Sequence, residues 1–108
     1  MTDTNNFPHA PADWTQAAAM GRIAEEGLVE SADLWDAIRA LQEFYSRHDN
    51  LRINSRELHD ALEEHFHKRG GMKFLYELLP GGPVSQGCRL AGLEPPAGSA
   101  DQSFGSVM

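Results

Sequence analysis

Cysteine is nearly absent from this chain, because Cys88 is the only one among 108 residues. A single thiol excludes an internal disulfide framework. It also excludes a cysteine-rich zinc site, which needs several thiolates at fixed spacings. A lone free cysteine is typical of a reducing compartment, so we expect a cytoplasmic protein.

Basic residues and long apolar runs are also scarce. The 9 Lys and Arg are outnumbered by 16 Asp and Glu, giving a formal net charge of -7, which opposes tight binding to nucleic-acid phosphates or anionic membranes. No apolar run approaches the roughly 20 residues of a membrane helix. The polar N-terminus lacks the basic and apolar regions of a signal peptide. We therefore expect no membrane partner and regard a nucleic-acid partner as disfavoured.

Hydrophobic residues make up 41% of the chain, enough for the modest core of a single domain. Their spacing predicts five helices, over about 13–26, 32–47, 55–69, 72–79 and 83–91. The clearest is 32–47, where apolar side chains recur at i, i+3, i+4 and i+7 and Ser31 provides an N-cap. We expect a mainly α fold, a small orthogonal bundle of about five helices.

The two ends of the chain differ from its helical middle. Residues 1–11 are polar and contain Pro8 and Pro11, so they are expected to form an irregular N-terminal arm. The helical domain is expected over residues 12–92. Residues 93–108 are rich in Pro, Gly and Ser and have little to bury, which predicts a flexible C-terminal tail.

The single thiol admits two interpretations. Cys88 lies about five residues into the fifth predicted helix, and the neighbouring Arg89 offers a positive charge that would favour the reactive thiolate. Alternatively, Cys88 is a small buried core residue, since cysteine is among the most buried residue types. Composition alone favours the buried interpretation.

Other polar residues show no convincing catalytic or metal-binding pattern. His59, His65 and His67 are separated by six and two positions, whereas metal ligands on one helix face are three or four apart. We therefore expect no metal and no cofactor. The two helices over residues 32–67 could form a DNA-binding helix-turn-helix, with positive charge from residues such as Arg56. The acidic residues of the same segment would repel phosphate and argue against DNA binding.

The C-terminal third carries a distinctive motif. Residues 74–99 read FLYELLPGGPVSQGCRLAGLEPPAGS. This resembles the ending of the DsrC/TusE family of sulfur-relay proteins, approximately LYxLFPxGPxxQAxKIAGLPKPxGC followed by one residue. Asp13-Trp14, Glu26-Gly27, the 35–45 segment and Arg56 also resemble family positions, so the likeness covers about residues 13–99. The matches within the motif need no gap and include Pro80, Gly82, Pro83, Gln86, Ala91, Gly92, Leu93 and Pro96.

The resemblance implies a compact helical bundle with a flexible C-terminal arm and, at most, a short remnant of the family's N-terminal hairpin. Family members carry sulfur as a persulfide on cysteine. In DsrC-type members two cysteines act, one at the position of Cys88 and one next to last on the arm, whereas TusE-type members use the arm cysteine alone. The arm position here is Ser99, eleven residues after Cys88, and a hydroxyl cannot carry a persulfide.

The resemblance therefore implies a sulfur-relay protein that handles sulfane sulfur or thiol exchange through Cys88, supported by Arg56, Gln86 and Arg89. Such a protein is a carrier rather than a stand-alone enzyme. Its expected partners are proteins of sulfur metabolism, a sulfite reductase or a sulfur-transfer complex. The missing arm cysteine leaves an alternative open, a regulatory or docking member that binds the same partners, or DNA, without carrying sulfur.

Overall fold

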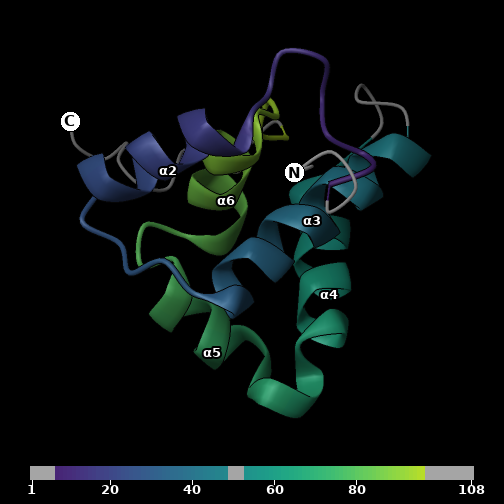
Figure 1. Ribbon diagram of the computed structural model, residues 1–108. Helices are drawn as coiled ribbons and strands as arrows, with labels where there is room; N and C mark the ends of the chain where they lie inside the picture. The colour runs from purple at the N-terminus through teal and green to yellow at the C-terminus, as the bar shows by residue number, and fades with distance from the viewer. Residues whose placement is uncertain (1–6, 49–52, 97–108) are drawn as a thin grey trace, which may run out of the picture.

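The computed structural model describes residues 7–48 and 53–96, which form a small bundle of helices (Figure 1). These ranges contain no strand, so the prediction of a mainly α fold is confirmed. Residues 7–15, where a hairpin remnant was considered, contain turns only, and residues 1–6 lie outside the described ranges. The elements are α2 (Gln16–Glu25), α3 (Ala32–Arg47), α4 (Ser55–His65), the 3-10 turn η2 (His67–Arg69), α5 (Gly71–Leu78) and α6 (Pro83–Ala91).

Side-chain caps fix where the first three helices begin. The Thr15 hydroxyl accepts from the Ala18 N–H, so α2 starts at Gln16 rather than near Asp13 as expected. Ser31 and Asn54 cap α3 and α4 in the same way, as their sequence positions predict. Each cap satisfies a backbone donor that has no partner inside the helix.

The third predicted helix is broken near its end. α4 stops at His65, Phe66 is fully buried, and η2 follows before Gly70 turns the chain. Gly70 has φ of 123°, a value that only glycine adopts without strain. The break turns the chain back, so that α5 packs against α4.

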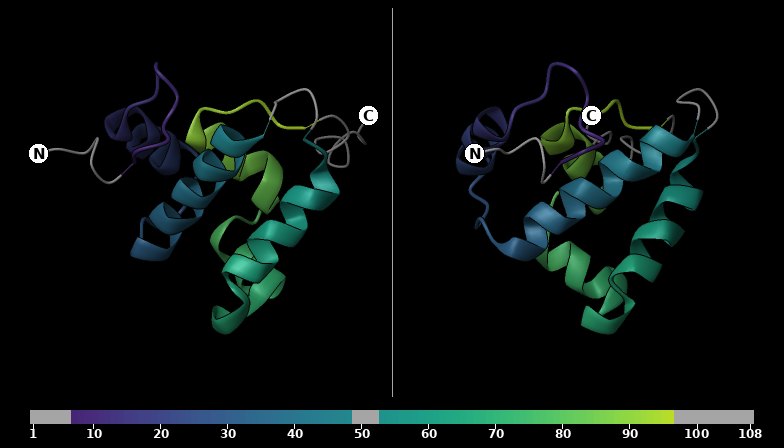
Figure 2. Two further views of the ribbon diagram at one scale, coloured as in Figure 1. Left: turned by 90° about the vertical axis from the view of Figure 1, so that its right-hand side faces the viewer. Right: turned by 45° about the vertical axis from the view of Figure 1, so that its right-hand side comes forward.

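Helix α3 lies at the centre of the bundle and packs against both α6 and α4 (Figure 2). Its inward face buries seven residues, including one polar side chain, Gln42. The N-terminal arm adds to this core, because Phe7 is buried between Trp14 and Trp35, with ring centroids 4.8 and 5.7 Å away. Its burial was not foreseen when the arm was predicted to be irregular.

Charged side chains join the start of α3 to the end of α4. Arg69 donates to Asp33 at 2.8 Å and to Asp36 at 2.7 Å, and its guanidinium lies 4.3 Å from the ring centre of Phe66. Burial acts to raise the pKa of Asp36, but the hydrogen bond from Arg69 and the nearby His65 outweigh it and leave the pKa below its ordinary value. These contacts tie η2, which follows α4, to the first turns of α3.

A glycine sets the distance between α3 and α6. A Cβ atom at Gly87 would lie 2.6 Å from Leu41 Cδ1 and 3.4 Å from Leu79 Cδ1. Both leucines are fully buried, so neither can move aside freely. Gly87 therefore allows α6 to approach α3 closely along the face that carries Cys88.

None of the helices in the described ranges has the length and apolar character needed to cross a membrane.

The close approach of α6 to α3 predicts that Gly87→Val destabilises the protein. The added side chain overpacks the core, so the free energy of unfolding should fall by ~1–3 kcal/mol in urea denaturation. Gly21→Val is the matched control, because a Cβ at Gly21 meets nothing within 4 Å. Equal stabilities for the two variants would contradict this packing.

Candidate functional site

Cys88 lies on the buried face of α6, and its residue surface is 0% exposed. Val84, Gly87 and Ala91, which are spaced to share a face of the helix with Cys88, are buried with it. Burial raises the pKa of the Cys88 thiol to about 11, and the hydrogen bond with Tyr45 acts in the opposite direction. In the folded protein the resting group at neutral pH is therefore the thiol and not the thiolate.

Tyr45 of α3 connects Cys88 to the segment that follows α6. The Cys88 Sγ donates to the Tyr45 hydroxyl at 3.7 Å, and the Tyr45 hydroxyl donates to the Glu94 carbonyl oxygen at 2.7 Å. Burial raises the pKa of Tyr45, and the neighbouring Cys88 raises it further, so the phenol keeps its proton. Thiol, hydroxyl and carbonyl form one chain of hydrogen bonds.

A second polar side chain of α3 faces the same helix. Gln42 is 1% exposed, and its Nε2 donates to the Ala91 carbonyl at 3.0 Å. Its Oε1 is buried with no hydrogen-bond partner among the described residues. Gln42 and Tyr45 are one turn apart on α3, and their contacts Ala91 and Cys88 are one turn apart on α6. The two helices thus face each other across a buried polar strip.

Residues 93–96, here called the strap, lie against the bundle. Figure 2 shows this segment, in yellow, running from the end of α6 towards the C-terminal end of α3. The Leu93 N–H donates to the Cys88 carbonyl at 2.8 Å, and Pro96 is buried. The first four residues of the predicted tail are therefore docked, while residues 97–108 lie outside the described ranges.

The turn that leads into the strap is covered by Trp14. Gly92 ends α6 in the left-handed conformation, with φ of 79°. A Cβ at Gly92 would lie 2.8 Å from Trp14 Cδ1, and the indole N–H of Trp14 donates to the Leu90 carbonyl at 2.7 Å. Trp14, just before α2, therefore holds the end of α6 and the start of the strap.

Gln86 and Arg89, predicted to support the site, hold α6 from its other side. Both contact the Glu26 carboxylate, at 2.6 Å from Gln86 Nε2 and 3.0 Å from Arg89 Nη2. The Gln86 Oε1 accepts from the Gly81 N–H at 2.8 Å, which secures the turn before α6. Burial acts to raise the pKa of Glu26, but the bonds from Arg89 and Gln86 bring it below its ordinary value.

Arg89 lies on the opposite side of α6 from the thiol that its charge was expected to favour. Arg89 is exposed and paired with Glu26, and the pKa of Cys88 is raised by burial rather than lowered by a cation. Consecutive residues on a helix point about 100° apart, so a neighbour in sequence does not reach the buried face. Arg56 is exposed on α4, and Ser99 lies outside the described residues.

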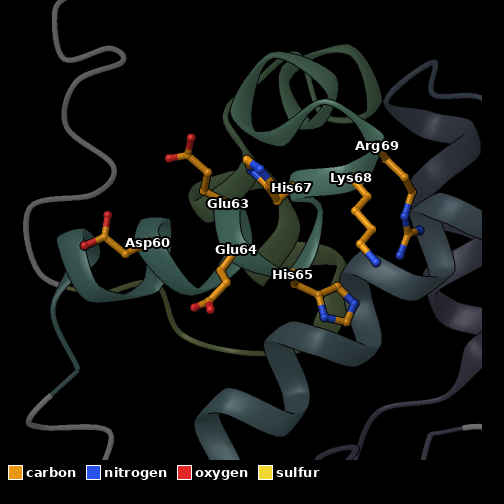
Figure 3. Close-up of a pocket in the computed structure, with 7 residues that line it drawn as sticks. All are labelled: Asp60, Glu63, Glu64, His65, His67, Lys68 and Arg69. Atoms are coloured by element: carbon orange, nitrogen blue, oxygen red, sulfur yellow. The ribbon is translucent and has the colours of Figure 1, made fainter.

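A separate surface hollow of about 750 Å³ lies along α4 and η2 (Figure 3). Its acidic and basic side chains are spread along the helix and do not converge on one point. Across residues 7–48 and 53–96, no three His, Cys, Asp or Glu side chains gather as metal ligands would. Cys88 does not line this hollow, whose residues are Asp60, Glu63, Glu64, His65, His67, Lys68 and Arg69.

The contact between Tyr45 and Cys88 was missed from the sequence. The two residues are separated by 43 positions, and no periodicity in one helix shows what faces it from another. A usable signal was present in Tyr45 itself, because a buried tyrosine hydroxyl requires a hydrogen-bond partner.

Comparison with known proteins covers most of the chain. The family model described as "DsrC like protein" matches residues 1–99. Sulfurtransferase TusE of Salmonella paratyphi A and Sulfurtransferase TusE of Salmonella typhimurium are each 33% identical to the chain over 96 residues, covering 88% of the chain and 87% of the relative. Sulfurtransferase TusE of Escherichia coli (strain K12) is 30% identical with the same coverage. No solved structure matches.

The family match extends over both the helical bundle and the strap. It includes the turn before α6, α6 itself and Cys88. Together with relatives that share about a third of their residues along nearly their whole length, it confirms the resemblance seen in the C-terminal motif. The chain belongs to the DsrC-like protein family.

Proposed function

We propose that this protein is a sulfur relay that accepts a sulfane sulfur on Cys88 and passes it to a partner protein. One observation carries the proposal: Cys88 is the only side chain of this sequence able to hold a persulfide, in a family whose curated relatives are named sulfurtransferases. These names favour relay over the alternative of a docking protein that carries no sulfur.

The proposed transfer conserves atoms and electrons. The Cys88 thiolate attacks the outer sulfur of a donor persulfide, R–S–SH, forming a new bond to Sγ. The S–S bond of the donor breaks, and the donor leaves as the thiolate R–S⁻. A partner thiolate then attacks the outer sulfur of the Cys88 persulfide, and Cys88 leaves as a thiolate. Sulfur moves without an external oxidant or reductant.

The sulfur acceptor must belong to another molecule. No second cysteine occurs in this sequence, and Ser99 at the arm position cannot accept sulfur. The partners are therefore proteins of sulfur transfer, and a sulfite reductase is the more specific candidate. Gln86 and Arg89 act by holding α6 in place, because both contact Glu26 and neither contacts the thiol.

Burial of Cys88 places a condition on this chemistry. A fully buried thiol with a raised pKa reacts only when the surrounding structure opens. The strap is the element best suited to open, because it follows the last described helix and lies directly over the end of α6, where its Leu93 bonds to Cys88 and its Glu94 to Tyr45. Donor attack should therefore follow local release of the strap rather than unfolding of the bundle.

Sulfur loading is tested by intact mass measurement. Reduced protein incubated with a persulfide donor should gain about 32 Da, the mass of one sulfur atom. Cys88→Ser should gain nothing, and treatment with excess dithiol should reverse the gain. The absence of an adduct on the wild type, or an equal adduct on Cys88→Ser, would disprove relay through Cys88.

The reactivity of the thiol gives a second prediction. With a pKa of about 11, Cys88 should be alkylated by iodoacetamide at least ~100-fold more slowly in the native protein at pH 8 than after unfolding, where the pKa is ~8.5. The native rate should keep rising by about tenfold per pH unit up to about pH 9.5. A native rate equal to the unfolded rate, or a plateau near pH 8, would contradict this burial.

A further inference from the structure

The Tyr45 hydroxyl has one proton and two neighbours that can use it. We infer that Tyr45 is a positioning residue that couples the strap to the sulfur chemistry. While the strap is docked, the Tyr45 hydroxyl donates its proton to the Glu94 carbonyl, and Cys88 remains a thiol. After the strap is released, the same hydroxyl donates to Cys88 and stabilises the thiolate. This inference rests on the proposed role of Cys88 as the sulfur acceptor.

The geometry defines the docked state. At 2.7 Å, the bond from Tyr45 to the Glu94 carbonyl is short, and a carbonyl oxygen can only accept. The hydroxyl proton is therefore committed to the strap. Towards Cys88 Sγ, at 3.7 Å, the hydroxyl has only lone pairs to offer, so the sulfur must keep its own proton to make this bond.

Release of the strap reverses these roles. When the Glu94 carbonyl leaves, the Tyr45 hydroxyl loses its acceptor and can rotate its proton towards Sγ. A hydroxyl that donates to a thiolate stabilises the charged form. The movement that admits a donor persulfide would thus also produce the nucleophile, while the closed strap keeps the thiol protonated and shielded.

Among residues 7–48 and 53–96, the cation nearest to Cys88 in sequence does not stabilise the thiolate. Arg89, the adjacent cation, is paired with Glu26 on the exposed side of α6. Besides burial, Tyr45 is the influence found on the Cys88 pKa within the described part of the chain, and its hydroxyl lowers that pKa when it donates to the sulfur. Tyr45 would therefore stabilise the thiolate, as a nearby cation does beside many reactive cysteines.

Two readouts separate strap docking from thiolate stabilisation. Hydrogen exchange of the Leu93 amide, which bonds to the Cys88 carbonyl, reports strap release. Iodoacetamide alkylation of Cys88 reports release together with thiolate formation. The variants are Tyr45→Phe, which removes only the hydroxyl, and Pro96→Gly, which removes a buried strap ring and keeps Tyr45. Tyr76→Phe, at an exposed tyrosine of α5, is the matched control.

Tyr45→Phe should speed Leu93 exchange by about fivefold, because one hydrogen bond to the strap is lost. Alkylation of Cys88 should not become faster along with this exchange, because the variant also lacks the hydroxyl that would stabilise the Cys88 thiolate. In Pro96→Gly, exchange and alkylation should rise together. Adding Tyr45→Phe to Pro96→Gly should then slow alkylation by about tenfold, the effect of removing a hydrogen bond to a charged group.

Contrary results are equally clear. Unchanged Leu93 exchange in Tyr45→Phe would show that Tyr45 does not hold the strap. Equal alkylation rates in Pro96→Gly with and without Tyr45→Phe would show that the hydroxyl does not stabilise the thiolate. Either result overturns the inference, provided that circular dichroism shows each variant folded and Tyr76→Phe behaves as wild type.

Neither readout uses sulfur transfer. If the couplings hold but no persulfide forms on Cys88, the proposed function fails while the role of Tyr45 in controlling the thiol stands. If a persulfide forms and the couplings are absent, relay through Cys88 stands and Tyr45 is only a packing residue.

Discussion

The close contact between α3 and α6 is the constraint on which the rest of this structure depends. Gly87 permits it, because any larger side chain would meet Leu41. Along the same contact, Gln42 bonds to the Ala91 carbonyl and Tyr45 bonds to Cys88. One side of α6 thus packs against polar and apolar side chains of α3. The hydrogen bond of the thiol is made by Tyr45, a residue of α3 more than 40 positions away in sequence. Glu26 holds the opposite side of α6 through Gln86 and Arg89, and Trp14 holds the C-terminal end of α6 through the Leu90 carbonyl.

Much of this fold could be predicted from local signals. The apolar spacing of residues 32–47 and the caps at Ser31 and Asn54 gave α3 and α4 their correct starts, because capping is decided within three or four residues. The end of α4 could not be predicted, since the break before η2 depends on Phe66 being buried in the core. The burial of Phe7 was hidden for the same reason, because its partners Trp14 and Trp35 lie in separate segments.

The site divides in a similar way. Cys88 was singled out because it is the only thiol, and its family position came from a motif of consecutive residues. Burial of a lone cysteine was also the interpretation that composition favoured, and the structure places Cys88 in the core. The direction of the Arg89 side chain could not be predicted in this way, because adjacency in a helix does not give a shared face. The pairing of Tyr45 with Cys88 and Glu94 required the folded chain.

A buried thiol and a sulfur carrier are compatible if burial is local and reversible. The resting state protects Cys88 from oxidation and unwanted alkylation, since the thiolate is the reactive form. Opening the strap breaks the Tyr45–Glu94 and Leu93–Cys88 hydrogen bonds and exposes Pro96, whereas unfolding the bundle would expose its whole core. The lost arm cysteine fits this arrangement, because sulfur then leaves Cys88 only for a thiol on another molecule.

The most direct measurement is the rate of sulfur uptake from a persulfide donor, compared between wild type and Pro96→Gly and mapped to a peptide. The account predicts faster uptake in Pro96→Gly, confined to the peptide that contains Cys88. Uptake that is no faster with the loosened strap, or that is found away from Cys88, would contradict it.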